Sequence, residues 1–241
     1  MIIKTRGIVL HHIKYSETSV IVTVFTENYG RQSFLIKGVR SKKSKIKANI
    51  LQPLFLLDME IYYKANRDLQ SVKEIQNAFI FSSIPYDLRK SSIAIFIAEI
   101  LYKTIREQEA NKELFDFLYH TIQYLDIKDK GISNFHIYFL IQLTRYLGFY
   151  PGNTYLEKDC YFDLKNGSFV QIKPVHPFYM NTEYSKLFST MIPFSTSQNE
   201  NEILSYTQRM GLLEKILEYY YLHNEGVSNI KSLSVLKEVF H

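Results

Sequence analysis

The chain has 241 residues, of which 46% are hydrophobic and 22% charged, a composition typical of folded proteins. No apolar run approaches the roughly 20 residues that cross a bilayer, and the N-terminal segment lacks the apolar core and cleavage site of a signal peptide. A single cysteine, Cys160, excludes an intramolecular disulfide and a zinc site built from cysteines. These features favour a cytoplasmic protein.

The net charge of +5 is concentrated in the N-terminal third of the chain. Residues 1–80 hold 13 basic and 6 acidic side chains, a balance of +7, whereas the remainder carries −2. Between Glu27 and Asp58 there is no acidic residue. A local basic field of this kind is what a module that binds a polyanion needs.

The first 80 residues predict strands, because β-branched residues alternate with a period of two. The expected strands cover residues 4–15, 19–27, 31–38, 54–64 and 68–79. A tight turn at Gly30 separates the second from the third. Five strands without a helix favour a small closed barrel, since closure removes exposed edges. The OB-fold is such a barrel, and it commonly binds oligonucleotides.

Near residues 80–85 the apolar period changes to 3.6, which predicts helices. They are expected at 91–109, 111–127, 133–148, 182–192 and 201–226, with a short helix or extended tail at 228–240. Asn111 is the expected N-cap of the second. The segment 149–177 is rich in proline and carries an Asn166-Gly167 turn, which indicates a hairpin insert. The predicted class is therefore α+β, with a barrel domain at 1–80 and a helical domain at 81–241.

Basic residues gather in the stretch "GVRSKKSKIKAN" (38–49) and in the strands before it. The candidates for binding nucleic acid are Lys4, Arg6, Arg31, Lys37, Arg40, Lys42, Lys43, Lys45 and Lys47. Lysine and arginine that reach phosphates release counterions, and in a barrel these residues could converge on one side. A solvated, mobile loop explains the same composition equally well. Among the aromatic residues, Tyr29 is the most exposed candidate for stacking on a base.

Motifs of catalysis are missing from the sequence. There is no glycine-rich phosphate loop, no H-E-x-x-H and no G-x-S-x-G, and the histidines form no pattern of metal ligands. We therefore predict no catalytic residue, no metal ligand and no enzymatic activity.

Two stretches resemble the RecO family of bacterial DNA repair proteins. The first follows the pattern S-E-x-S, V-F-T, a Gly-Arg turn, K-G-x-R-x-x-x-S and Q-P, and the second is the C-terminal stretch from 212 to 236. The first pattern is carried by Ser16, Glu17, Ser19, Val24, Phe25, Thr26, Gly30, Arg31, Lys37, Gly38, Arg40, Ser44, Gln52 and Pro53.

The resemblance implies an N-terminal OB-fold, a C-terminal helical domain and a place at the nucleoid. It implies a protein that binds single- and double-stranded DNA and anneals complementary strands. The partners implied are RecR, in some cases RecF, and the C-terminal tail of the single-strand-binding protein, together with which RecA is loaded onto covered single strands in the RecF pathway. DNA contacts are carried over to Arg31, Lys37, Arg40, Lys42, Lys43 and Lys45, whereas the partner-binding residues are unknown.

Many relatives in this family carry a four-cysteine zinc site in the insert. Here the insert at about 149–177 contains only Cys160, so we expect a degenerate, zinc-finger-like insert without a cofactor. Packing of Tyr155, Phe162 and Phe169 is expected to hold it together. The leading hypothesis is a non-catalytic recombination mediator. The alternatives are a metal-dependent DNA-processing enzyme and a protein–protein adaptor without direct DNA binding.

Overall fold

The protein is described by a computed structural model that covers residues 1–39, 46–152, 155, 160–193 and 204–240. The chain divides into two compact units, residues 1–127 and 128–241, which are described separately below. Strands give way to helices between Asn77 and Leu88, as the change of period predicts. The first two helices nevertheless belong to the same compact unit as the barrel, so a domain boundary at residues 80–85 stays a prediction.

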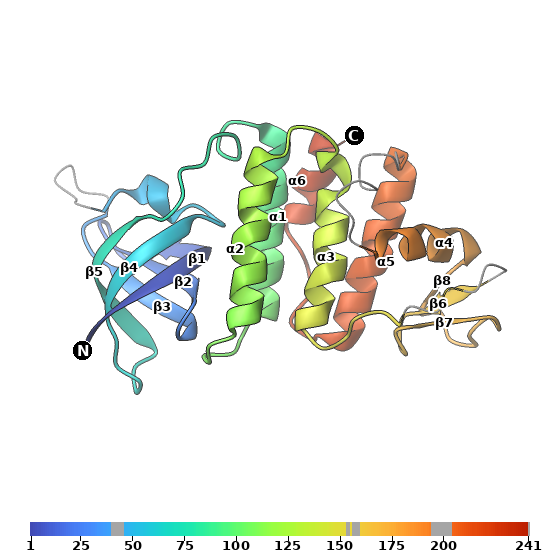
Figure 1. Cartoon of the computed structure of the whole chain (residues 1–241), viewed down its shortest axis with the longest axis horizontal. Helices are drawn as coiled ribbons and strands as arrows, with labels where there is room; N and C mark the ends of the chain where they lie inside the picture. Colours follow the sequence, from blue (N-terminus) through green and yellow to red (C-terminus); the bar gives the residue numbers. More distant parts are fainter. Residues whose placement is uncertain (40–45, 153–154, 156–159, 194–203, 241) are drawn as a thin grey trace. The chain divides into compact units, whose positions relative to one another are not determined.

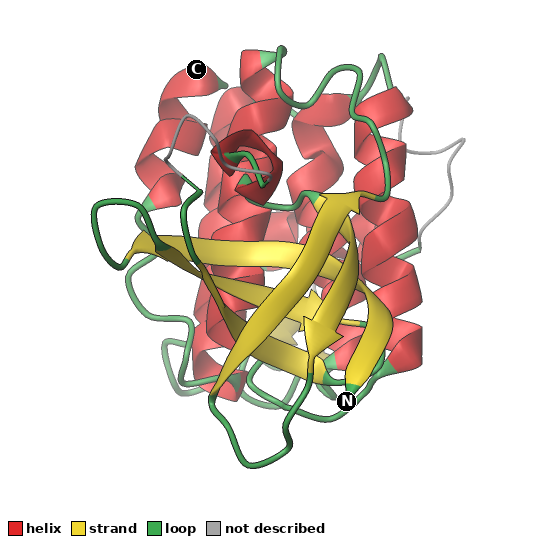
Figure 2. Cartoon of the chain, turned by 90° about the vertical axis from the view of Figure 1, so that its left-hand side faces the viewer, coloured by secondary structure: helices red, strands yellow, loops and turns green. Residues whose placement is uncertain are grey.

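The strands of the first unit form a closed barrel in the order β1-β2-β3-β5-β4 (Figures 1 and 2), which confirms the predicted five-stranded OB-fold. Only β3 and β5 pair in parallel, and antiparallel pairing of β1 with β4 closes the barrel. The strands are β1 (Ile2–Lys14), β2 (Val20–Thr26), β3 (Gly30–Ile36), β4 (Leu56–Tyr62) and β5 (Leu69–Asn77), with a short 3₁₀ turn, η1 (Ala48–Leu51), before β4.

Inside the barrel, alternate residues of each strand make the apolar core, and Val22 and Phe34 are fully buried. Gly7 permits this packing, because a Cβ there would lie 2.5 Å from Val24 Cγ1. Val39 and Ile46, which flank residues 40–45, both pack on the same core. The two ends of the predicted basic loop are therefore anchored in the barrel.

Two helices complete the first unit: α1 (Leu88–Thr104) and α2 (Lys112–Ile127). Asp87 caps α1, and the side chain of Asn111 accepts a hydrogen bond of 3.0 Å from the backbone of Leu114, as the sequence predicts for α2. The carboxylate of Asp126 in α2 accepts hydrogen bonds from the backbone N–H groups of residues 82–84 and so fixes the connection into α1.

Within its described residues, the second unit contains four α-helices, a 3₁₀ turn and a small sheet of order β7-β6-β8. In chain order these are η2 (Ile132–Asn134), α3 (Phe135–Tyr146), β6 (Tyr161–Asp163), β7 (Ser168–Val170), β8 (Tyr179–Met180), α4 (Thr182–Met191), α5 (Tyr206–His223) and α6 (Ser232–Val239). The start predicted for α5 at residue 201 is too early, because Ser205 and Gln208 form a capping box that begins the helix at Tyr206.

Aromatic packing holds the insert in the second unit, as predicted. The ring of Phe162 lies 4.9 Å from that of Phe169 and 4.6 Å from that of Phe188, and Tyr155 packs on Phe169 at 5.4 Å. Gly167 forms the hairpin turn with φ of +63°, directly against the hydroxyl of Tyr219. Among the described residues, none of the helices combines the length and apolarity that a membrane span requires.

Candidate nucleic-acid interface

Arg31, a predicted DNA contact, is engaged inside the first unit. Its Nη1 donates hydrogen bonds of 2.6 Å to the carbonyl of Tyr102 and 2.7 Å to the carbonyl of Ile105, at the C-terminal end of α1. The guanidinium also lies 4.4 Å from the centre of the Tyr102 ring. A cation is favourable at a helix C-terminus, where carbonyls lack intrahelical partners. The geometry thus gives Arg31 a structural role.

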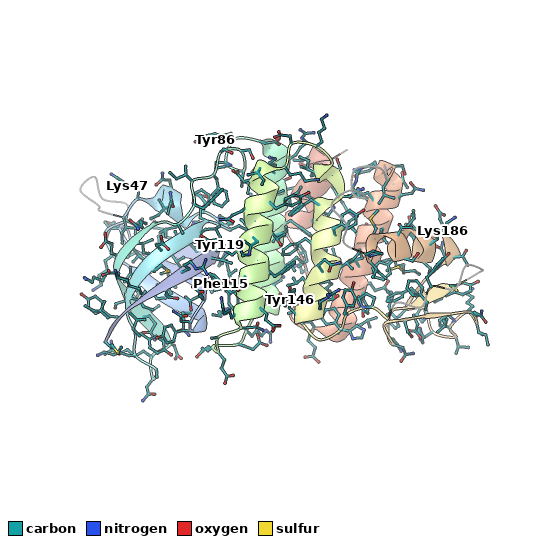
Figure 3. The ribbon with its side chains drawn as sticks, viewed as in Figure 1. Lys47, Tyr86, Phe115, Tyr119, Tyr146 and Lys186 are labelled. Atoms are coloured by element: carbon teal, nitrogen blue, oxygen red, sulfur yellow. The ribbon has the colours of Figure 1, made fainter. Side chains whose placement is uncertain are left out.

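Arg6 is also engaged within the first unit, by a carboxylate and by two rings of α2. It donates hydrogen bonds of 2.9 and 2.8 Å to the carboxylate of Glu27, and its guanidinium lies over the rings of Phe115 and Tyr119 of α2. Figure 3 shows both rings reaching from α2 toward the barrel. These hydrogen bonds hold the pKa of the Glu27 carboxyl below its ordinary value.

Lys4 is exposed, but it borders a hollow of about 430 Å³ that is lined by carboxylates. Lys4 Nζ lies 3.5 Å from Glu60, and Asp58 and Glu74 line the same hollow. Carboxylates repel phosphates, so this face offers a poor surface for DNA. The first-strand cations Lys4 and Arg6 therefore do not join a single basic face with Lys37, which lies toward the other end of the barrel.

At that other end, Lys14 and Lys37 lie on either side of the start of β2, with Lys14 on the face of Val20 and Ile36 and Lys37, one residue further, directed to the opposite face. The backbone of Val20 pairs with Lys14 on one side and with Ile36 on the other, so the two lysines are separated by on the order of 10 Å of sheet. Both side chains are exposed. Lys14 is absent from the residues predicted from the sequence, because its neighbourhood depends on strand pairing.

Tyr15 adds an aromatic ring to this end of the barrel. Its side chain is 61% exposed, and its backbone N–H donates to the carbonyl of Ser19 in a tight turn between β1 and β2. Glu17 is the one acidic residue of that turn. The stacking role proposed for Tyr29 finds no support here, since that ring is half-buried and stacks on Tyr63 at 4.0 Å.

Lys47 is also exposed and stands at the start of η1, on the side of the barrel away from α1 and α2 (Figure 3). Arg40, Lys42, Lys43 and Lys45 lie outside the described residues, between the anchored positions Val39 and Ile46. We call the set Lys14, Tyr15, Lys37 and Lys47 the basic end of the barrel. Its cations can bind phosphates and its tyrosine can stack on an unpaired base.

Metal ligands were sought in the same residues. Across the part of the chain that the structure describes, no three histidine, cysteine or acidic side chains are grouped so as to hold a metal ion. Cys160 is buried.

The chain matches two family models. The one described as "Recombination protein O N terminal" matches residues 1–81, and the one described as "Recombination protein O C terminal" matches residues 85–155. Similar proteins described as "DNA repair protein RecO" come from Phocaeicola vulgatus (38% identical over 240 residues), Bacteroides fragilis (41% over 241) and Flavobacterium psychrophilum (40% over 242), and each alignment covers 100% of both chains. The chain therefore belongs to the RecO family of DNA repair proteins.

Proposed function

We propose that the chain is a non-catalytic recombination mediator that binds single- and double-stranded DNA and anneals complementary strands. Its place of action is the nucleoid in the cytoplasm. Membership of a DNA repair family supports the general role. The observation that carries the DNA-binding part is the clustering of exposed Lys14, Lys37 and Tyr15 at one end of the barrel, where β1 and β3 flank the start of β2.

In the proposed mechanism, the basic end grips phosphates of one strand, with Arg40, Lys42, Lys43 and Lys45 contributing from residues 40–45. Neutralising phosphates releases counterions and lowers the repulsion between two polyanions, so that complementary strands can approach. Base pairing supplies the sequence specificity, because phosphate contacts carry none. No bond is made or broken by the protein in this scheme.

The partners belong to the same proposal. We propose that the chain works with RecR and RecF, that it binds the C-terminal tail of the single-strand-binding protein, and that together they help load RecA onto covered single strands. The resemblance to the family supports these partners, and we assign no residues to them.

The direct experiment measures binding and annealing of labelled oligonucleotides across a salt series without added metal. Charge reversal at Lys42, Lys43 and Lys45 is expected to weaken both binding and annealing. For single strands, the slope of log K against log salt is expected to fall by up to roughly 2, because each lost phosphate contact removes about 0.7. The matched control reverses Lys4, Lys64 and Lys112, which lie elsewhere on the first unit. Equal effects of the two triple variants would contradict the proposed site.

The same purified protein also separates the proposal from a metal-dependent enzyme. Cutting of the labelled strands after magnesium is added, at a rate that follows the protein through purification, would contradict the non-catalytic role. Intact strands and retained annealing are the expected result.

A further inference from the structure

The small sheet of the second unit carries a surface with aromatic rings. Phe162 faces the interior of the unit, so its neighbour Tyr161 lies on the opposite face of β6. Strand register places Tyr179 of β8 opposite Asp163, which puts this second tyrosine on the same outer face as Tyr161. The two rings are half-buried, with their centroids 5.7 Å apart.

The charge of this surface is positive. Within residues 160–181, all of which the structure describes, the exposed charged side chains are Lys165 and Lys173. Lys165 Nζ lies 5.0 Å from the centre of the Phe178 ring, and Lys173 Nζ lies 5.5 Å from that of Tyr179. The insert's described carboxylate, Asp163, is buried. These two exposed cations favour a partner that brings negative charge.

The carboxylate of Asp163 is hydrogen-bonded within the hairpin itself. Its Oδ2 accepts a hydrogen bond of 2.8 Å from Asn166 Nδ2 and lies 3.4 Å from His176 Nε2, while its Oδ1 accepts from the backbone N–H of Lys165. These bonds hold the pKa of Asp163 below its ordinary value, although burial opposes the shift. In the part of the chain that the structure describes, the carboxylate is in ion-pair contact with His176 rather than with either lysine.

Close to Lys173 lies a hollow of about 720 Å³, whose apolar lining is Val170, Ile172, Pro174 and Val175 and whose polar lining includes Asp163, Asn166 and His176. Ile172 is 84% exposed and Val175 is fully exposed, which is unusual for two β-branched apolar side chains in one short loop. Pro174 and Pro177 restrict the backbone of this loop. A restricted loop loses little conformational entropy when a ligand covers it.

The insert face is defined as Tyr161, Ile172, Lys173, Val175 and Tyr179, together with Lys165 of the hairpin turn, which lies over the Phe178 ring. We propose that the insert face is a second binding site for single-stranded nucleic acid, separate from the basic end of the barrel. The two lysines bind phosphates, and unpaired bases pack on the tyrosines and on the exposed apolar side chains. Lys173 leaves the ring of Tyr179 for a phosphate and so uncovers the ring for a base.

Single-stranded nucleic acid fits this surface better than the other anionic partners. In a duplex the bases are stacked on one another and leave the rings and apolar side chains without a partner. An acidic protein segment pairs with the lysines but offers no flat group for the two tyrosines. The use of this site to hold the second strand during annealing rests on the proposed function, whereas the binding itself does not.

The test measures the number of oligo(dT) strands that one full chain binds. Each strand has about 16 nucleotides, a length that a single OB-fold can cover. Oligo(dT) cannot pair with itself, so base pairing does not contribute. Wild type is expected to bind two strands per chain, and Lys165→Glu/Lys173→Glu only one. In wild type, these two lysines are expected to contribute roughly 1.4 to the salt slope of the second, weaker step, at about 0.7 for each lysine.

A matched control reverses the same number of charges in the same unit at exposed positions outside the insert: Lys130→Glu/Lys186→Glu, with Lys186 on α4 (Figure 3). The control is expected to keep both strands. Tyr161→Leu removes a ring without changing charge, and is expected to weaken the second step about tenfold. Thermal melting of each variant confirms that it is folded.

Three results would overturn the inference. They are an unchanged strand count in the Lys165/Lys173 variant, equal losses in that variant and its control, and displacement of oligo(dT) from the insert face by polyglutamate of equal charge. Reversal of Lys14 and Lys37 tests the barrel site independently. If reversal of Lys14 and Lys37 leaves DNA binding unchanged while the insert variant binds one strand fewer than wild type, the proposed site on the barrel is wrong and the proposed site on the insert is supported.

Discussion

Arg31 on β3 binds the C-terminal end of α1 by donating a hydrogen bond of 2.7 Å to the carbonyl of Ile105. The backbone N–H of Arg31 donates to the carbonyl of Glu107 in the connection that follows. The preceding residue, Gly30, adopts φ of +58°, and a Cβ there would collide with the carbonyls of Glu107 and Glu109. The Gly-Arg turn is therefore required for joining the barrel to the helices.

The first prediction concerns this joint. Arg31→Ala is expected to lower the free energy of unfolding by about 2–3 kcal/mol, because it leaves carbonyls at the end of α1 without a charged donor. Urea denaturation measures the change. Lys37→Ala, at an exposed position, is expected to stay within about 0.5 kcal/mol of wild type.

Binding of oligonucleotides distinguishes the two roles further. Under conditions where both variants are folded, Arg31→Ala is expected to bind DNA as wild type does, whereas Lys37→Ala binds more weakly. If the arginine variant keeps its stability and loses DNA binding, Arg31 contacts DNA and its structural role is wrong.

A second prediction follows from the Arg6–Glu27 pair. Hydrogen bonds from Arg6 lower the pKa of Glu27 in the folded state, so the pair stabilises the fold above the carboxyl's unfolded pKa. That stabilisation is lost as the pH falls through the depressed folded pKa. Glu27→Gln is expected to cost about 1 kcal/mol at neutral pH, because a charge-assisted pair is replaced by a neutral one.

The measurement is a pH series of urea midpoints for wild type, Glu27→Gln and the exposed control Glu17→Gln. The difference between wild type and Glu27→Gln is expected to vanish toward low pH, and the control to follow wild type throughout. A difference that stays constant with pH would show that the charge of Glu27 does not contribute.

The third prediction concerns the insert. Phe162→Ala is expected to destabilise the protein by about 3–5 kcal/mol, because its fully buried ring packs on Phe169 and Phe188. Thermal melting with and without a chelator is the measurement, and the chelator is expected to leave the melting temperature of wild type unchanged. A large drop on chelation would show that a metal, rather than aromatic packing, holds the insert. Ile172→Ala is the exposed control.

Local sequence patterns predicted much of the fold. Alternation of apolar and polar residues predicted the five strands. The helix cap at Asn111 and the turn at Asn166-Gly167 were predictable because their hydrogen bonds join residues only a few positions apart. The start of α5 at Tyr206 is also predictable from the sequence, since Ser205 and Gln208 have the spacing of a capping box.

The site was less predictable, because basic residues look alike in a sequence whether they bind carbonyls or face solvent. Arg31 contacts residues 71 and 74 positions away in the chain, and only the fold brings them together. Lys14 and Lys37 share one end of the barrel only because β2 pairs with both β1 and β3. In the sequence, the signal for this end of the barrel is Lys14 followed by Tyr15 at the end of the first predicted strand.

The most direct test of the account is the salt dependence of single-strand binding by Lys14→Glu/Lys37→Glu/Lys47→Glu. The matched control is Lys4→Glu/Lys64→Glu/Lys112→Glu, which makes the same charge change elsewhere on the same unit. The account predicts that the first variant lowers the slope of log K against log salt by up to roughly 2, with slower annealing, while the control stays near wild type. Equal slopes in the two variants would contradict a DNA site at the basic end of the barrel.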